Sequence, residues 1–257
     1  MNEDNKKSIS SSLINCFYEA GDLSIKLRNL GLKKEIKEDN TPVTNGDLEV
    51  NKLITEKIKI LTPEIPIISE ESSKNKTKEN LKNFWLIDPI DGTYDYINNK
   101  DEFTINAALI LNNKPEIGII YAPSKKRMFY TYSSNNSYEI YQDKEIKLGC
   151  KKKSKNGEIK AVSYSEKLKP IIKQWHEKFN VTNHTKMKSS LKFCVIATGE
   201  YDLYVAESRA REWDIAAGHA ILINAGGIIT DFENNEVLYG KKNFLNTSLI
   251  LKRSSLL

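Results

Sequence analysis

The start of the chain carries apolar side chains at the spacing of two amphipathic helices. Over residues 4–30 they recur every three or four positions, which predicts a helix that ends near Gly31. A second helix is predicted over 46–61, before Pro63 and Pro66. The apolar sets are Ile9, Leu13, Phe17, Ala20, Leu23, Leu27 and Leu30 in the first helix, and Leu48, Val50, Leu53, Ile54, Ile58 and Ile60 in the second.

Strand patterns follow. Residues 84–87 (FWLI) are apolar without alternation, which is typical of a strand buried on both faces, and we expect this strand to end at Asp88. A shorter strand over 65–68 precedes the acidic turn 69–71, and the polar residues 72–83 predict a mobile loop. Segments rich in Ile, Tyr, Phe and Thr predict an antiparallel meander over 103–111, 115–122, 126–133, 137–142 and 145–148.

The second half of the chain alternates strands and helices. The predicted strands are 159–163, 181–184, 202–205, 228–230 and 249–251, and the predicted helices are 168–179, 189–199 and 213–225. The last of these helices is rich in small residues and should pack very closely. The lysine-rich residues 149–158 favour a solvated connection, so we predict an N-terminal lobe, 1–150, and a C-terminal lobe, 151–257.

Composition narrows the class of protein. With 257 residues, 39% hydrophobic and 28% charged, the chain is typical of a soluble globular protein. No apolar run approaches the roughly 20 residues of a membrane span, and the polar N-terminus is not a secretory signal. The three cysteines share no metal-ligand spacing and favour free thiols in the cytoplasm. The modest net charge of +5, without aromatic residues interleaved among basic ones, disfavours binding to nucleic-acid polymers.

Candidate chemistry begins after the strand 84–87. Pro89 biases Asp88 to extended backbone, and Asp91 and Gly92 form a turn before a short helix that Thr93 can cap. Two neighbouring carboxylates favour a bound cation, and the N–H groups of Gly92 and Thr93 suit a phosphate. The alternative is a surface turn with two solvated aspartates.

Three further carboxylates, Asp47, Glu70 and Asp214, stand at strand ends or helix starts, where ligands converge in layered α/β proteins. Alternatively, Asp47 and Asp214 could be carboxylates that the helix dipole favours at a helix N-terminus, and Glu70 could lie in a solvated turn. All-oxygen ligands favour Mg²⁺ over zinc or copper, and a P-loop sequence is absent. Among the histidines we expect His219 to pack or hydrogen-bond, and His176 and His184 to lie on the surface.

Three motifs together resemble the inositol monophosphatase superfamily of Mg²⁺-dependent, lithium-sensitive phosphatases: SEE at 69–71, DPIDGT at 88–93 and WDIAAGHA at 213–220. Within it, EFTINAALI (102–110), GIIYAP (118–123) and SSLKFC (189–194) look most like the bacterial 3'(2'),5'-bisphosphate nucleotidases. The resemblance implies an α/β protein with the layered αβαβα sugar-phosphatase fold, an α+β N-terminal lobe carrying most metal ligands and an α/β C-terminal lobe.

The resemblance also implies the metal ligands. Glu70, Asp88 and the carbonyl of Ile90 would hold one Mg²⁺, and Asp88, Asp91 and Asp214 a second. Glu70 could hold a weaker third ion through water.

Catalytic and substrate-binding roles follow from the same resemblance. Asp47 and Thr93 would activate a water, and Glu70 would assist. Substrate contacts are implied for Gly92, Thr93 and Asp214, and Ser190 and Lys192 are candidates for contacting the nucleotide or its second phosphate. Two departures from the pattern are Asn45-Gly46 before Asp47 and the segment AESRARE at 206–212, which borders the substrate in the family.

The resulting hypothesis is a Mg²⁺-dependent phosphomonoesterase, with two or three ions, that hydrolyses adenosine 3',5'-bisphosphate to AMP and phosphate. Its partner would be a small phosphate ester. The alternatives are a phosphatase for inositol 1-phosphate or another sugar phosphate, and a metal-binding regulatory protein without catalysis. We expect a cytoplasmic monomer or homodimer; peripheral association with the inner membrane is left open.

Overall fold

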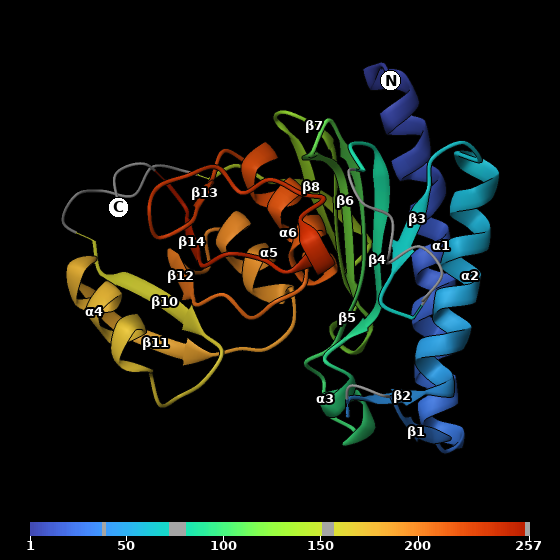
Figure 1. Cartoon of the computed structure of the whole chain (residues 1–257), viewed down its shortest axis with the longest axis horizontal. Helices are drawn as coiled ribbons and strands as arrows, with labels where there is room; N and C mark the ends of the chain where they lie inside the picture. Colours follow the sequence, from blue (N-terminus) through green and yellow to red (C-terminus); the bar gives the residue numbers. More distant parts are fainter. Residues whose placement is uncertain (38–39, 72–80, 151–156, 255–257) are drawn as a thin grey trace.

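The computed structural model describes residues 1–37, 40–71, 81–150 and 157–254. Helices and sheets alternate in five layers, αβαβα (Figure 1). The outer pair α1 (Glu3–Leu30) and α2 (Asn45–Leu61) covers a seven-stranded sheet, and a central pair, α5 (Leu191–Ala197) and α6 (Glu212–Asn224), separates it from a five-stranded sheet. Helix α4 (Pro170–Lys178) covers the far side of the second sheet. The predicted layered α/β fold is confirmed.

The large sheet contains the predicted meander in the order β3-β4-β5-β6-β7-β8-β9. Only β3 and β4 run parallel within it, and the other neighbours pair antiparallel. The hairpins β5–β6 and β8–β9 turn through residue pairs with positive φ, Asn112-Asn113 and Gln142-Asp143, as two-residue type I′ turns require. The strands are β3 (Ile67–Ser69), β4 (Phe84–Asp91), β5 (Thr104–Leu111), β6 (Lys114–Ala122), β7 (Arg127–Ser133), β8 (Asn136–Tyr141) and β9 (Lys144–Lys147).

The second sheet has the order β11-β10-β12-β14-β13, with the two pairings of β10 parallel and the others antiparallel. A separate hairpin pairs β1 with β2 near the start of α2. The remaining elements are β1 (Lys34–Ile36), β2 (Pro42–Thr44), α3 (Thr93–Ile97), η1 (Pro123–Lys125), β10 (Ile159–Ser163), β11 (Val181–Lys186), β12 (Leu203–Ala206), β13 (Ile228–Thr230), η2 (Lys242–Phe244) and β14 (Leu249–Lys252).

Strand β4 is buried on both faces, as its sequence predicts. Phe84 and Leu86 join the core on the side of α5 and α6, whereas Trp85 and Ile87 join the core under α1 and α2. The strand does not end at Asp88, because pairing with β5 resumes at Asp91 after one extra residue on β4. This bulge keeps the segment that carries both aspartates attached to the sheet.

Three of the predicted apolar helix positions are wrong. Leu30, Leu48 and Ile60 are 74%, 45% and 77% exposed. Leu48 and Ile60 each lie two positions from a buried residue, Val50 or Ile58, and two positions along a helix turn the side chain to the opposite face. Leu30 is the last residue of α1, six positions past Ser24, the last buried residue of this helix.

The histidine predictions had mixed outcomes. His219 hydrogen-bonds through Nδ1 to the Tyr239 hydroxyl at 2.8 Å, and burial lowers its pKa to about 3, so it is neutral as expected. His176 was expected on the surface but is 5% exposed, because α4 turns it toward the sheet beside His184, which is partly exposed.

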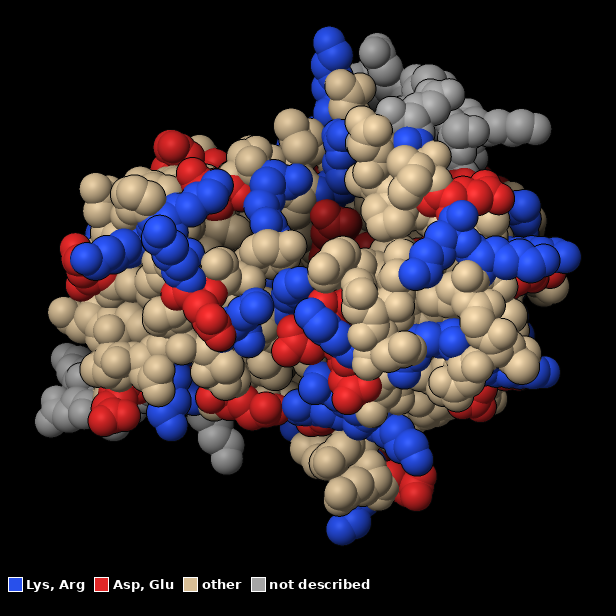
Figure 2. All heavy atoms as spheres, turned by 90° about the horizontal axis from the view of Figure 1, so that it is seen from below, with Lys and Arg blue, Asp and Glu red and all other residues tan. Residues whose placement is uncertain are grey.

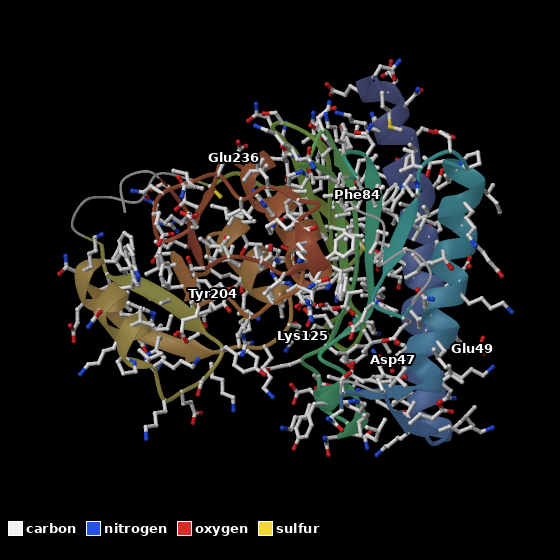
Figure 3. The ribbon with its side chains drawn as sticks, viewed as in Figure 1. Asp47, Glu49, Phe84, Lys125, Tyr204 and Glu236 are labelled. Carbon is white, nitrogen blue, oxygen red and sulfur yellow. The ribbon has the colours of Figure 1, made fainter. Side chains whose placement is uncertain are left out.

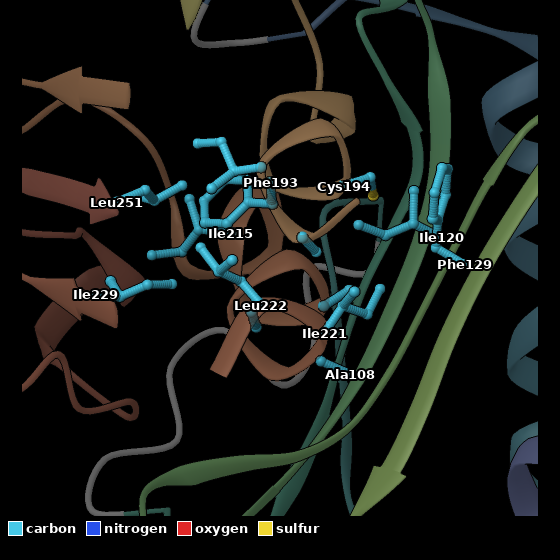
Figure 4. Close-up of a cluster of buried hydrophobic side chains, with 14 of the residues drawn as sticks. Ala108, Ile120, Phe129, Phe193, Cys194, Ile215, Ile221, Leu222, Ile229 and Leu251 are labelled. Atoms are coloured by element: carbon cyan, nitrogen blue, oxygen red, sulfur yellow. The ribbon is translucent and has the colours of Figure 1, made fainter. Parts of the chain in front are cut away.

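Helix α6 packs as closely as its small residues predict (Figure 4). A Cβ on Gly218 would lie 2.4 Å from the ring of Phe193 on α5, and one on Gly118 of β6 would lie 2.4 Å from the carbonyl oxygen of Ala217. The central layer therefore contacts β6 through backbone as well as side chains.

Residues 151–156, at the predicted lobe boundary, and 72–80 of the predicted loop lie outside the described residues, and the division into lobes stays a prediction. None of the described helices has the length and apolar character needed to cross a bilayer.

We expect Gly118→Ala to lower the free energy of unfolding by about 1–3 kcal/mol, because the methyl group must displace the backbone of α6. Urea denaturation would measure the change. Gly149→Ala is the matched control, since no atom of the described residues lies within 4 Å of its Cβ position. Equal stability of both variants would contradict this account of the packing.

Candidate active site

The acidic residues predicted from strand ends and helix starts meet at one end of the large sheet. Glu70 follows β3, Asp88 lies in β4 and Asp214 lies in the first turn of α6. Their carboxylate oxygens lie within 4.8 Å of one another. Parallel pairing of β3 with β4 brings two of them together, since the Glu70 N–H donates to the Ile87 carbonyl at 3.0 Å. We refer to Glu70, Asp88 and Asp214 as the acidic group.

Asp91 borders the acidic group but is not one of its members. Its Oδ2 accepts a hydrogen bond from the Ser190 hydroxyl at 2.7 Å. Asp88 instead accepts from the N–H of Ile90 at 3.1 Å, within the bulge. Ligation by Asp91 and by the Ile90 carbonyl stays a prediction.

Without a cation, the charged forms of the carboxylates in the acidic group are disfavoured by burial and by mutual repulsion. Burial raises the pKa of Asp88 and of Asp214 well above the usual carboxyl range. Neighbouring carboxylates raise both further, Glu70 acting most on Asp88 and Asp91 most on Asp214. A divalent cation would reverse this effect, because it stabilises the charged form of every carboxylate around it.

Asp47 has two structural links. Its Oδ2 accepts hydrogen bonds from the Thr44 N–H at 2.8 Å and the Thr44 hydroxyl at 2.6 Å, completing the capping box of α2. Its Oδ1 lies 3.3 Å from the hydroxyl of Thr93. Burial raises its pKa, against the lowering effect of the Thr44 hydrogen bonds. Asp47 therefore stabilises the start of α2 with one carboxylate oxygen, as the alternative predicted, and contacts Thr93 with the other.

Asp214 also caps a helix, because its Oδ2 accepts from the Arg211 N–H at 2.7 Å. It nevertheless supplies an oxygen to the acidic group. A carboxylate near a helix N-terminus thus serves the fold and the site together.

Thr93 does not cap α3, contrary to expectation. Gly92 occupies the N-cap position with φ of 97°, and a Cβ there would lie 2.9 Å from the Glu102 carbonyl, so glycine is required. The Thr93 hydroxyl is turned to Asp47 and to the carbonyl of Ile90, 3.1 Å away. This leaves the hydroxyl beside the acidic group rather than on its own helix.

Ser190 and Lys192 lie on the opposite wall of the site. The Ser190 hydroxyl lies 2.6 Å from the Asp214 carbonyl and accepts from the Asn106 side chain at 2.9 Å, in addition to its bond to Asp91. Lys192 is 7% exposed and donates to the Ser189 carbonyl. Burial lowers its pKa to about 8, against the opposing effect of Asp91. Their predicted contacts with substrate remain predictions.

Some residues of the site escaped prediction. Lys37, from the segment after β1, places its Nζ 3.2 Å from Glu70 and 2.6 Å from Glu71. Asn106 of β5 positions Ser190, and Arg209 stacks on Tyr164 at the mouth of the site. No local pattern distinguishes Lys37, which the fold alone brings to the acidic group. Asn106 and Arg209 lie in the segments 102–110 and 206–212 that the resemblance singles out, although neither was named as a site residue.

Comparison with known proteins finds relatives over most of the chain. The chain is 36% identical over 238 residues to the 3'(2'),5'-bisphosphate nucleotidase CysQ of Buchnera aphidicola, covering 89% of this chain and 87% of that protein. It is 31% identical over 246 residues to the nucleotidase of the same name from Aggregatibacter actinomycetemcomitans, with 93% and 86% coverage. The crystal structure of CysQ from Bacteroides thetaiotaomicron superposes with a TM-score of 0.77 at 26% identity, covering 95% of this chain and 97% of that one.

The fold is also shared with the Thermotoga maritima IMPase, at a TM-score of 0.74 and 24% identity, over 93% of this chain and 90% of the other. The model of the inositol monophosphatase family matches residues 9–255. Since that match spans nearly the whole chain, the protein belongs to the inositol monophosphatase family.

Proposed function

We propose that the protein is a Mg²⁺-dependent phosphomonoesterase that releases the 3'-phosphate of adenosine 3',5'-bisphosphate. The observation that carries this proposal is the acidic group, with carboxylate oxygens within 4.8 Å of one another, bordered by the Asp47–Thr93 contact. The 3'(2'),5'-bisphosphate nucleotidases among its relatives support the choice of substrate.

The donor set fits Mg²⁺. Glu70, Asp88, Asp91, Asp214 and the Ile90 carbonyl offer only oxygen, which hard divalent cations prefer. The raised pKa of Asp88 and of Asp214 indicates a site that lacks positive charge. Two or three ions would share these ligands, and when bound they would neutralise phosphate oxygens and acidify a water.

The chain's own groups supply the proton transfer. Thr93 would accept a proton from the attacking water while its own proton passes to Asp47. The water oxygen forms a bond to phosphorus as the ester P–O bond breaks opposite to it, and the leaving 3'-oxygen takes a proton from solvent to become a hydroxyl. No covalent enzyme intermediate is needed. The backbone N–H groups of Gly92 and Thr93 would orient the phosphate. A protein that only bound metal would not need the Asp47–Thr93 pair.

The test is phosphate release from adenosine 3',5'-bisphosphate and from inositol 1-phosphate, with Mg²⁺ and with Mg²⁺ plus Li⁺. Mg²⁺-dependent preference for the bisphosphate, inhibited by Li⁺, is the expected result. Preference for inositol 1-phosphate would retain the metal chemistry and reject the nucleotide. Mg²⁺ binding without phosphate release from either substrate would favour the regulatory alternative.

Assembly as monomer or homodimer and cytoplasmic location remain predictions, and the comparisons lend no support to membrane association.

We also expect Mg²⁺ to raise the melting temperature, and to raise it more at pH 8 than at pH 5. Because burial raises the folded-state pKa of Asp88 and of Asp214, the metal-free protein loses stability as pH rises through those values. Mg²⁺ binds the deprotonated form, so its benefit grows over the same range. Thermal melts with NaCl at equal ionic strength are the control. A shift independent of pH would contradict binding at these carboxylates.

A further inference from the structure

A group of cations and tyrosine rings lies beside the acidic group, on the side away from Asp47. One small pocket is lined by Asp91 and Asp214 and also by Tyr164, Lys192 and Arg209. In Figure 3, Tyr204 of the same pocket lies on the side of the second sheet, whereas Asp47 lies near α2. The face in Figure 2 shows acidic side chains deep in a hollow, with Lys and Arg side chains along one side of it. Positive charge therefore stands next to the acidic group.

Arg209 is held at this place by a fixed loop. The Ser208 hydroxyl donates to the Asn246 carbonyl, and the Asn246 N–H donates to the Ala210 carbonyl at 3.0 Å, so both neighbours of Arg209 are anchored. The guanidinium lies 3.5 Å from the centroid of the Tyr164 ring. Stacking on an aromatic ring uses one face of a guanidinium and leaves its in-plane N–H donors available for a phosphate.

The other cations nearby already have partners. Lys188 lies 3.0 Å from Asp95, and Lys192 donates to the Ser189 carbonyl. The neighbouring acid, Glu207, pairs with Lys169 at 2.5 Å. Arg209, which is exposed, has no carboxylate partner within ion-pair distance in the part of the chain that the structure describes.

We propose that Arg209 is a specificity-determining residue that binds the second phosphate of a bisphosphorylated nucleotide. Its place in a pocket that also exposes Asp91 and Asp214 puts a second anion site within one small substrate's length of the acidic group. A planar guanidinium matches phosphate geometry with two parallel hydrogen bonds. A nucleoside monophosphate has no second phosphate that Arg209 could bind. This inference rests on the proposed function.

The test compares adenosine 3',5'-bisphosphate with adenosine 3'-monophosphate, which lacks only the second phosphate. Arg209→Ala should lower kcat/KM for the bisphosphate roughly 10- to 100-fold, as expected for the loss of hydrogen bonds to a charged group. It should leave kcat/KM for the monophosphate unchanged. Arg209→Lys should recover part of the loss, since it restores the charge without the planar donor pair.

Lys144→Ala is the control for loss of one positive charge, because Lys144 is exposed on β9 at the opposite edge of the large sheet from β3. The Mg²⁺-induced melting shift verifies that each variant is folded with an intact metal site. Equal losses on both substrates, or no loss on either, would overturn the role of Arg209. Wild-type protein that hydrolyses neither nucleotide would instead reject the proposed function.

Discussion

Asp88→Asn is expected to lower kcat/KM by at least about 1,000-fold, since metal-ion stabilisation of transition-state charge is worth several kcal/mol. Asp88 is the member of the acidic group with the deepest burial, at 2% exposed, and the resemblance assigns it to two ions. An amide of the same shape keeps the packing of β4 but replaces a charged ligand with a neutral one. Asp91→Asn should also abolish activity by removing a predicted ligand while leaving the fold intact.

The same substitution should stabilise the metal-free protein. The raised pKa of Asp88 means that its charged form is disfavoured by folding, so its contribution to stability is present below the ordinary carboxyl pKa and is lost as pH rises through the folded value. Asparagine carries no such penalty at neutral pH. Asp88→Asn should therefore melt at a higher temperature than the wild type without Mg²⁺, and it should lose most of the Mg²⁺-induced shift.

Parallel activity assays and thermal melts check both effects. Asp143→Asn is the matched control, because Asp143 is exposed in the β8–β9 turn and its positive φ suits asparagine. Normal turnover by Asp88→Asn would reject the metal site. Loss of activity together with a lower melting temperature in the absence of Mg²⁺ would indicate structural damage instead.

Sequence could predict the elements whose signal is local. The unbroken FWLI run of β4 is apolar because both faces of that strand are covered, and the small residues of α6 fit a helix pressed between two sheets. The acidic group was also predictable, since Glu70 follows β3, Asp214 lies in the first turn of α6, and Asp88 directly follows the apolar FWLI run. The resemblance to the family then placed them together.

Long-range contacts escaped prediction. Lys37 meets Glu70 although 33 positions separate them in the sequence, and Arg209 meets Tyr164 because two loops of the second sheet converge. Helix phase was a different source of error: Val50, Ile54 and Ile58 recur every four positions on the covered face, whereas Leu48 and Ile60 lie two positions off that stripe and are exposed. Residue type alone therefore did not reveal the contacts of Lys37 and Arg209 or the exposure of Leu48 and Ile60.

The second large effect concerns the pair that would activate water. Asp47 caps α2 through Thr44, so replacing it changes the fold and the site together. Thr93 is the cleaner target, because its hydroxyl lies between Asp47 and the Ile90 carbonyl while its backbone begins α3. Thr93→Val keeps the shape of the side chain and removes only the group that would pass the proton.

Thr93→Val should reduce kcat about 100- to 10,000-fold, the usual range for loss of a general acid–base group. The Mg²⁺-induced melting shift should persist, since the Thr93 side chain is not a predicted ligand, and Thr93→Ser should retain most of the activity. If Thr93→Val kept its turnover, the proton would leave by another route, and the pair would be left with the structural role of joining α2 to α3.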